Sequence, residues 1–318
     1  DFGCNPCSEI ILRPYQFCNL SEVVVRESDT VDTLKEKVRL ATILGTFQAT
    51  LTNFKYLRKI WKDNTEEERL LGVSLTGIMD NNLTATAGDK LATVLELLKD
   101  TAVQTNAAMA KQLFIPQSTA VTCVKPSGTV SQLTDAASGI HARHNPFYIR
   151  TVRGDNKDPL TQFLMSQGIP AEADVMKPDS TTVFSFPMKS PQGAVTRMQM
   201  NAIEQLELWL TYQRHFCEHK PSVTISVKEN EWMQVGSWVY DHFDEVSGIS
   251  FLPFSEHTYQ QAPYQDIDEK EYKEFLTKMP SSVDWSLLQE FEKEDTTSGG
   301  RELACTAGVC EIVDIEAA

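Results

Sequence analysis

Three residues near the N-terminus, Asn5, Cys7 and Glu9, carry an amide, a thiol and a carboxylate at alternate positions. In an extended loop, alternate residues project to the same side of the chain. One short loop would therefore present a hydrogen-bonding amide, a sulfur and a proton acceptor to one substrate. Another thiol, Cys18, follows eleven residues after Cys7.

The other cysteines allow several interpretations. Cys4 and Cys7 form a C-x-x-C, which is compatible with a zinc half-site, a redox pair or two incidental thiols. Cys305 and Cys310 follow a Ser-Gly-Gly linker, so they are either a tethered dithiol shuttle, the other half of a four-cysteine zinc site, or incidental thiols on a flexible tail. The isolated Cys123 and Cys217 have apolar neighbours and are predicted to be core thiols.

The segment Lys125-Pro-Ser-Gly-Thr-Val-Ser131 joins a predicted strand to a predicted helix. Exposed backbone N–H groups, hydroxyls and the positive end of a helix favour an anion such as phosphate. The spacing is not that of a Walker loop. Serine and threonine are also common helix caps, so a purely structural role stays open.

The segment from His141 to Arg153 is the only locally basic stretch of an acidic chain. It carries His141, Arg143, His144, Arg150 and Arg153. These side chains either face an anionic ligand or form a solvated surface. At the end of another predicted helix, Glu218 and His219 follow Cys217, and a structural role is expected for this histidine.

Composition excludes several classes of protein. The 318 residues carry a formal charge of −15, which argues against binding to a nucleic-acid backbone. No run approaches the roughly 18 apolar residues that a membrane helix needs. The odd number of cysteines, seven, and the absence of a signal-peptide pattern argue against a secreted disulfide scaffold.

Hydrophobic periodicity predicts the elements that must position these groups. Apolar residues recur every three or four positions over 28–62, 88–112 and 200–219, which predicts helices there. Strands are expected within 118–133, 180–188 and 221–229, and the last of these alternates with a period of two. Strands separated by helices predict a mostly parallel α/β arrangement.

Six motifs together resemble the large catalytic chain of ribonucleotide reductases. In order, they are NPCSEI (5–10), LLGVSLTGIMD (70–80), VKPSGTVSQL (124–133), HKPSVTISV (219–227), GISFLPF (248–254) and the terminal Cys305-x4-Cys310. The spacing from Cys7 to Cys18 and the absence of adjacent tyrosines favour the adenosylcobalamin-dependent (class II) branch. The resemblance is to its monomeric ribonucleoside-triphosphate reductases.

The resemblance implies catalytic roles for the first group of residues. Cys7 would be the thiyl radical that takes hydrogen from the ribose 3′-carbon, and Glu9 the general base on the 3′-hydroxyl. Asn5 would hydrogen-bond the ribose. Cys18 would be one of two reducing thiols, and Cys305 and Cys310 would restore them and be reduced in turn by a thioredoxin-like donor. The substrate phosphates would lie on Ser127, Gly128, Thr129 and Ser131.

The resemblance also implies a fold and partners. Residues 1–290 would be the C-terminal half of a ten-stranded α/β barrel, with the thiyl-cysteine finger loop at its start, and residues 291–318 a flexible redox-active tail. The family's N-terminal half, which supplies the first strands and the thiol partner of Cys18, would be a required partner. The resemblance implies adenosylcobalamin as the cofactor and the cytoplasm as the location. It implies no metal site in the protein, no nucleic-acid partner and no membrane partner.

Two other interpretations stay open. One is the large chain of a di-iron (class I) reductase, which depends on a second radical-bearing protein. The other is a non-catalytic nucleotide-binding or zinc-stabilised module of the same fold.

Overall fold

The computed structural model describes residues 2–254 and 260–293. By its internal contacts the chain divides into two compact units, each formed by two stretches of sequence. Unit 1 comprises Asp1–Arg143 and Pro191–Phe254, and unit 2 comprises His144–Ser190 and Ser255–Ala318. Unit 2 was not predicted as a separate unit within residues 1–290, and the predicted boundary of the tail at residue 290 stays a prediction.

Unit 1 is built on parallel strands. β3 (Asn19–Val24) pairs with β4 (Leu71–Thr76), which pairs with β5 (Thr122–Cys123). β9 (Val223–Val227) pairs with β10 (Ile249–Pro253), and a parallel bridge between Val124 and Pro221 joins the two groups. The order across the unit is therefore β3-β4-β5-β9-β10, with β3 and β10 paired on one side only within the described residues.

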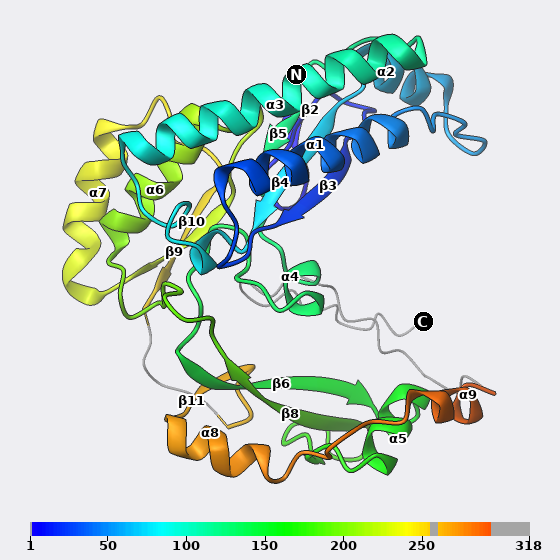
Figure 1. Ribbon diagram of the computed structural model, residues 1–318, viewed down its shortest axis with the longest axis vertical. Helices are drawn as coiled ribbons and strands as arrows, with labels where there is room; N and C mark the ends of the chain where they lie inside the picture. The colour runs from blue at the N-terminus through cyan, green and yellow to red at the C-terminus, as the bar shows by residue number, and fades with distance from the viewer. Residues whose placement is uncertain (1, 255–259, 294–318) are drawn as a thin grey trace, which may run out of the picture. The chain divides into compact units, whose positions relative to one another are not determined.

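Amphipathic helices connect and cover these strands. They are α1 (Val31–Gln48), α2 (Lys59–Glu68), α3 (Asp89–Leu113), α6 (Ala202–His215) and α7 (Trp232–Asp241), with the short α4 (Val130–Leu133) after β5. Single 3₁₀ turns lie at Ile78–Asp80 and Glu229–Glu231. Figure 1 shows α1 and α3 lying together along β3, β4 and β5, while α6 and α7 accompany β9 and β10.

The single helix predicted over 28–62 was wrong, because the structure has two helices there. α1 ends at Gln48 and α2 begins at Lys59. Two threonines in the break are used in local contacts: Thr50 Oγ1 donates to the Phe47 carbonyl, and Thr52 Oγ1 donates to Glu66 Oε1 at 2.6 Å. The bond from Thr50 to a backbone carbonyl is of the kind that competes with helix continuation.

The core of unit 1 lies between the sheet and its helices. β4 is buried at every position, as expected for a strand covered on both faces. The largest side chains in this core include Trp209 and Tyr212, which are completely buried, and Trp209 Nε1 donates to the Pro221 carbonyl at 2.8 Å. A two-stranded hairpin of β1 (Gly3–Cys4) and β2 (Ile11–Leu12) precedes β3.

Unit 2 is an antiparallel sheet, so the expectation of mostly parallel strands does not hold there. Its strand order is β11-β6-β8-β7, from Tyr264–Asp266, Phe147–Asp155, Thr181–Lys189 and Ala171–Ala173. The helices of this unit are α5 (Pro159–Ser166), α8 (Glu269–Leu276) and α9 (Leu288–Phe291), with a 3₁₀ turn at Trp285–Leu287. β7 and β8 are joined by a short turn, which reverses the chain and makes them antiparallel.

Among the helices that the structure describes, none has the length and apolar character needed to cross a bilayer.

Candidate functional site

The loop between β1 and β2 holds the first group of candidate residues. The Ser8 amide donates to the Asn5 carbonyl at 2.9 Å, and Ser8 has φ of 64°, which closes the loop sharply. Asn5 Oδ1 accepts from the Ile10 amide at 3.1 Å. The amide oxygen of Asn5 therefore shapes the loop itself, and the role of Asn5 toward a substrate stays a prediction.

Glu9 is a completely buried carboxylate. Its Oε1 lies 3.2 Å from Lys125 Nζ, whereas its Oε2 is buried without a hydrogen-bond partner among the described residues. An unpartnered carboxylate oxygen is costly to bury. This oxygen is therefore a ready acceptor for a ligand hydroxyl.

Lys125 joins Glu9 to Cys7. Its Nζ lies 3.5 Å from Cys7 Sγ, and Cys7 itself is half-buried. Burial lowers the pKa of Lys125, but the charge of Glu9 and the Cys7 sulfur raise it by more, so the net pKa lies above its ordinary value. One protonated amine therefore contacts both the thiol and the carboxylate of the hairpin loop.

Cys18 lies immediately before β3 and faces the same carboxylate. Burial, and then the charge of Glu9, raise the pKa of the Cys18 thiol far above its ordinary value. Cys18 therefore keeps its proton at neutral pH. Cys123, on β5, is completely buried as expected, and Cys217 is half-buried against the core.

The turn that follows β5 has the expected hydroxyls in two different environments. Ser127 and Ser131 are buried: Ser127 Oγ accepts from the Ser131 amide at 3.0 Å, and the Ser131 hydroxyl donates to the Ser127 carbonyl. Thr129 is exposed, and its side chain does not cap α4. Within the part of the chain that the structure describes, the amides of Gly128 and Thr129 donate no hydrogen bond.

Glu22, on β3, is a further acidic group at this site. Burial raises its pKa, and the nearby side chains of Ser127, Lys125 and Thr76 lower it by less. Its Oε1 is buried without a hydrogen-bond partner in the described residues. β3, β5 and the hairpin loop thus bring Cys7, Glu9, Cys18, Glu22, Lys125 and Ser127 into one polar cluster.

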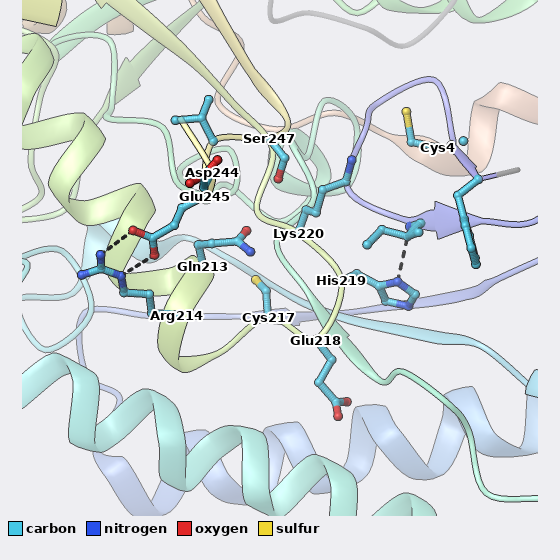
Figure 2. A pocket seen from close by; sticks show the side chains of 14 residues that line it. Cys4, Gln213, Arg214, Cys217, Glu218, His219, Lys220, Asp244, Glu245 and Ser247 are labelled. Carbon is cyan, nitrogen blue, oxygen red and sulfur yellow. Dashed lines mark hydrogen bonds and ion pairs between the residues drawn. The ribbon is translucent and has the colours of Figure 1, made fainter. Parts of the chain in front are cut away.

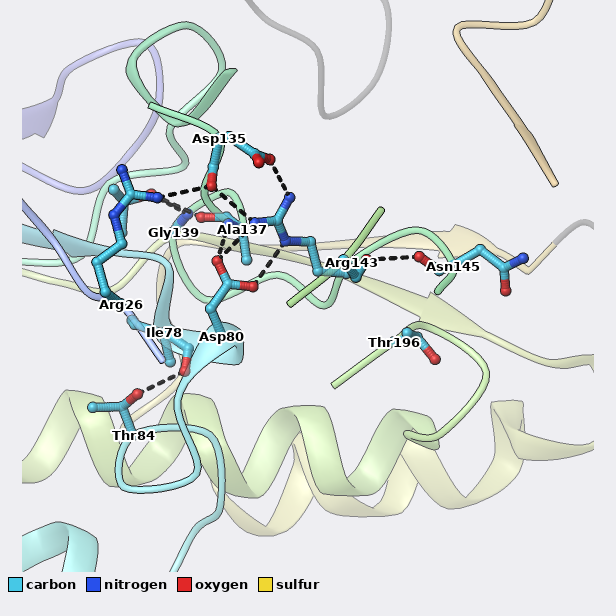
Figure 3. A network of polar contacts seen from close by, with 12 residues as sticks. Arg26, Ile78, Asp80, Thr84, Asp135, Ala137, Gly139, Arg143, Asn145 and Thr196 are labelled. Atoms are coloured by element: carbon cyan, nitrogen blue, oxygen red, sulfur yellow. Dashed lines mark hydrogen bonds and ion pairs between the residues drawn. The ribbon is translucent and has the colours of Figure 1, made fainter. Parts of the chain in front are cut away.

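A buried ion-pair network holds the segment after α4 against the end of β4 (Figure 3). Arg143 Nε and Nη2 lie 2.8 and 2.9 Å from the two carboxylate oxygens of Asp80, and Arg143 Nη1 lies 3.0 Å from Asp135 Oδ1. The Ala137 amide also donates to Asp80 Oδ2 at 2.8 Å. This network fixes residues 135–143, which pack behind the turn.

The suggestion that the basic stretch faces a ligand or solvent was therefore wrong for Arg143, whereas its other members are partly exposed and have internal partners. Arg143 is buried in the network, and His141 Nε2 accepts from the Thr224 amide at 3.0 Å. In unit 2, Arg150 Nη1 donates to the Pro263 carbonyl at 3.1 Å, and Arg153 Nε lies 2.7 Å from Asp174 Oδ2. Arg143, Arg150 and Arg153 therefore each form hydrogen bonds or ion pairs within the protein.

His219 has the structural role that was expected. Its Nδ1 lies 3.4 Å from the Ile11 amide and its Nε2 lies 2.9 Å from the Leu71 carbonyl, so it links β2 to β4. Burial lowers the pKa of His219, which keeps the ring neutral. Figure 2 shows His219 on the wall of a hollow of about 720 Å³ that also includes Cys4 and Cys217 but not Cys7.

Cys305 and Cys310 lie outside the described residues, so the shuttle, zinc and incidental interpretations of this pair stay open. Within the described residues, no group of three or more histidine, cysteine or acidic side chains is arranged to hold a metal. Sequence reasoning missed the side-chain contacts of Lys125 and the positions of Glu22 and Asp80. Their sequence signals are weak, because nothing local to Lys125 indicates more than the start of a turn.

Comparison with known proteins identifies consistent relatives. An adenosylcobalamin-dependent ribonucleoside-triphosphate reductase of Euglena gracilis is 29% identical, over 89% of this chain and 39% of that protein. The protein of the same name from Lactobacillus delbrueckii subsp. bulgaricus is 27% identical over 98% of this chain and 45% of its own length. A probable adenosylcobalamin-dependent ribonucleoside-triphosphate reductase of Dictyostelium discoideum is 28% identical, over 98% of this chain and 40% of that protein. No family model matches.

Solved structures agree on the fold. A crystal structure of a B12-dependent (class II) ribonucleotide reductase superposes with a TM-score of 0.78 at 24% identity, over 92% of this chain and 44% of that one. The class Id ribonucleotide reductase alpha subunit of Actinobacillus ureae gives a TM-score of 0.50 at 13% identity. The predicted resemblance and the α/β fold are therefore confirmed, and the chain spans less than half the length of these curated relatives.

Proposed function

We propose that this chain is the C-terminal catalytic portion of an adenosylcobalamin-dependent reductase that converts ribonucleoside triphosphates to 2′-deoxyribonucleotides. The observation that carries the proposal is the geometry at Glu9. A completely buried carboxylate is fixed by Lys125 at Oε1 and has no partner at Oε2, and the same ammonium contacts Cys7. This is the pairing of a proton acceptor with a sulfur that the reaction requires.

In the proposed reaction, Cys7 and Glu9 act on the same ribose. The Cys7 thiyl radical takes the hydrogen atom from the 3′-carbon, and Glu9 Oε2 accepts the proton of the 3′-hydroxyl. The 2′-hydroxyl then leaves as water. Glu9 finally returns the proton to the 3′-oxygen and Cys7 returns its hydrogen atom to the 3′-carbon, so both residues are regenerated in each cycle.

Two thiols supply the electrons, and Cys18 is one of them. The pair gives up two hydrogens, one to the departing water and one to the 2′-carbon, and is left as a disulfide. The raised pKa of Cys18 supports this role, because a thiol that keeps its proton has that proton to give. Cys305 and Cys310 would reduce the disulfide by thiol exchange and be reduced in turn by a thioredoxin-like donor.

The turn 125–131 is proposed to hold the substrate phosphates. The amides of Gly128 and Thr129 are without partners among the described residues, and the hydroxyl of Thr129 is exposed. Backbone amides at a strand-to-helix turn suit an anion. The buried Ser127 and Ser131 bond to one another and would support the turn rather than contact phosphate.

We propose adenosylcobalamin as the cofactor because the named relatives depend on it. In this structure, one residue, Cys7, fits that proposal. Cys7 is half-buried and not sealed in the core, which is compatible with approach of a radical source. The two described hollows, of about 720 and 350 Å³, do not include Cys7, so no other residue is assigned to hold the cofactor. When bound, adenosylcobalamin supplies the radical that activates the Cys7 thiol. A reducing cytoplasm would keep the other thiols reduced.

The arrangement of unit 1 supports a half-barrel with the hairpin loop as its finger loop. Five strands run parallel in the order β3-β4-β5-β9-β10, and β3 and β10 are each paired on one side within the described residues. Unpaired strand edges are a template for further pairing. We propose that the N-terminal half of the longer relatives supplies the remaining strands and is needed for turnover.

The di-iron alternative is less favoured because the named relatives depend on adenosylcobalamin. The test uses the chain together with its preceding segment. Turnover should require adenosylcobalamin and no second radical-bearing protein. Glu9→Gln should lower kcat by about 10²–10⁴-fold, the usual contribution of a general base. Cofactor-independent turnover, or an unchanged kcat in this variant, would contradict the proposal.

The tail roles have a separate test. Cys305→Ser should abolish turnover driven by thioredoxin and retain turnover driven by a small dithiol. Equal losses with both reductants would exclude the shuttle. Stoichiometric zinc on Cys4, Cys7, Cys305 and Cys310 would instead support the non-catalytic module.

A further inference from the structure

We propose that Lys125 is a positioning residue that orients Glu9, so that Oε2 faces the substrate, and couples the phosphate turn to the hairpin loop. The inference deepens the proposed function and rests on it. Lys125 begins the turn that we assign to the substrate phosphates, yet its side chain ends at Cys7 and Glu9, more than 100 residues away in the sequence.

The contacts of Lys125 distinguish the two oxygens of Glu9. Nζ lies 3.2 Å from Oε1 and 3.5 Å from Cys7 Sγ, while Oε2 is buried and has no partner in the described residues. A carboxylate held at one oxygen by an ammonium cannot rotate freely. Lys125 therefore determines which oxygen of Glu9 is left to accept a proton.

The charge of Lys125 matters as much as its position. A buried carboxylate without a cation tends to be neutral and is then a poor base. The groups that face Glu9 are the thiols of Cys7, Cys18 and Cys123, the buried and neutral His219, and Lys125. Lys220 contributes its backbone amide, 3.1 Å from the Glu9 carbonyl. Among these groups, Lys125 is the one that places a positive charge beside the Glu9 carboxylate.

The backbone of Lys125 is fixed from two sides, which makes coupling between the loops direct. Its amide donates to Ser74 Oγ on β4 at 2.8 Å. On the other side, Gly139 has φ of 54° and approaches so closely that a Cβ there would lie 2.5 Å from the Lys125 carbonyl oxygen. This anchoring holds the Lys125 side chain in one place between the turn and the hairpin loop.

The test compares Lys125→Met and Lys125→Arg with Lys111→Met, an exposed control at the end of α3, in the chain carrying its preceding segment. K125M should lower kcat by about 10²-fold with little change in KM. K125R should recover part of the kcat, and K111M should match the wild type.

A measurement without turnover separates this inference from the proposed function. An ammonium beside a thiol favours its thiolate form, so K125M should slow the alkylation of Cys7 by iodoacetamide about tenfold, with Cys4 unchanged. Thermal unfolding checks that the variants fold, and Lys125→Gln carries the same test if K125M is unstable.

The results of these experiments separate the role of Lys125 from the proposed function. A wild-type kcat in K125M, or a raised KM with unchanged kcat, overturns the positioning role and leaves the proposed function standing. If the wild-type protein makes no deoxyribonucleotide, the proposed function fails. An unchanged Cys7 alkylation rate in K125M then overturns the placement of Lys125 as well.

Discussion

At the residue scale, the site depends on contacts that cross long stretches of sequence. The alternation of Asn5, Cys7 and Glu9 predicted an extended loop with all three on one side. The structure instead closes this loop at Ser8, turns the Asn5 amide oxygen to the Ile10 amide and buries Glu9. Lys125 could not be identified in the same way, because its distances to Cys7 and Glu9 follow from the pairing of β3, β4 and β5 rather than from local pattern. Glu22 was missed for the same reason.

The thiols should differ strongly in reactivity. Cys18 has a strongly raised pKa because of burial and the nearby Glu9 charge, whereas Cys4 is exposed. At pH 7.5, we expect iodoacetamide to alkylate Cys18 at least about 10²-fold more slowly than Cys4, since the thiolate is the nucleophile. Mass spectrometry of timed samples measures both rates, with the buried Cys123 as the slow control. Equal rates for Cys4 and Cys18 would contradict the described environment of Cys18.

Two histidines of unit 1, one buried and one partly buried, should make stability depend on pH. Burial lowers the pKa of His141 and His219, so below the unfolded value of about 6.5 the unfolded state binds more protons than the folded state. The free energy of unfolding should therefore decrease as the pH falls from 7 to 5, by up to about 1.4 kcal/mol per pH unit for each histidine. Urea unfolding across this range measures the slope. His219→Gln should flatten it, and an unchanged slope in both single glutamine variants would contradict the assignment.

At the scale of elements, the periodicity of hydrophobic residues predicted several helices and strands correctly. α3 (Asp89–Leu113) and β9 (Val223–Val227) lie within the predicted segments 88–112 and 221–229, apart from one residue at the end of α3. The break between α1 and α2 was missed because apolar residues continue through it. The antiparallel pairing of β6 and β8 was missed because strand direction depends on partners far away in the sequence.

The Asp80–Arg143 ion pair should be the most sensitive polar contact of unit 1. Both side chains are almost completely buried and bond through two atoms each. Asp80→Ala should lower the free energy of unfolding by about 3–5 kcal/mol, because it leaves the guanidinium buried without this partner. Urea denaturation measures the loss. Asp63→Ala, which removes an exposed pair with Lys59, should have no measurable effect, and comparable losses would contradict the account.

At the scale of the whole molecule, one face of unit 1 carries features of an incomplete interface. On α1, Leu40, Leu44 and Phe47 are 52%, 64% and 48% exposed, at the spacing of one helical stripe. α1 packs on β3, which is paired on one side only within the described residues. An apolar stripe beside a strand edge is a place where further chain would pack.

This interface predicts a difference between two forms of the protein. In the 318-residue chain, Leu44→Glu should change the free energy of unfolding by less than about 0.5 kcal/mol, since the site is exposed. With the preceding segment present, the same change should cost at least about 2 kcal/mol, because the charge would be buried. Phe114→Glu, at the exposed end of α3, should behave alike in both forms. Equal effects of Leu44→Glu in both forms would contradict the proposal that further chain packs on this face of unit 1.

The central claim is that Cys7 carries the radical chemistry of ribonucleotide reduction. The direct test measures deoxyribonucleotide formed from a ribonucleoside triphosphate by the chain with its preceding segment, adenosylcobalamin and a small dithiol. We expect product with the wild type and with Cys4→Ser, which removes a thiol from the same hairpin, and none above background with Cys7→Ser. Wild-type product levels in Cys7→Ser would contradict the account.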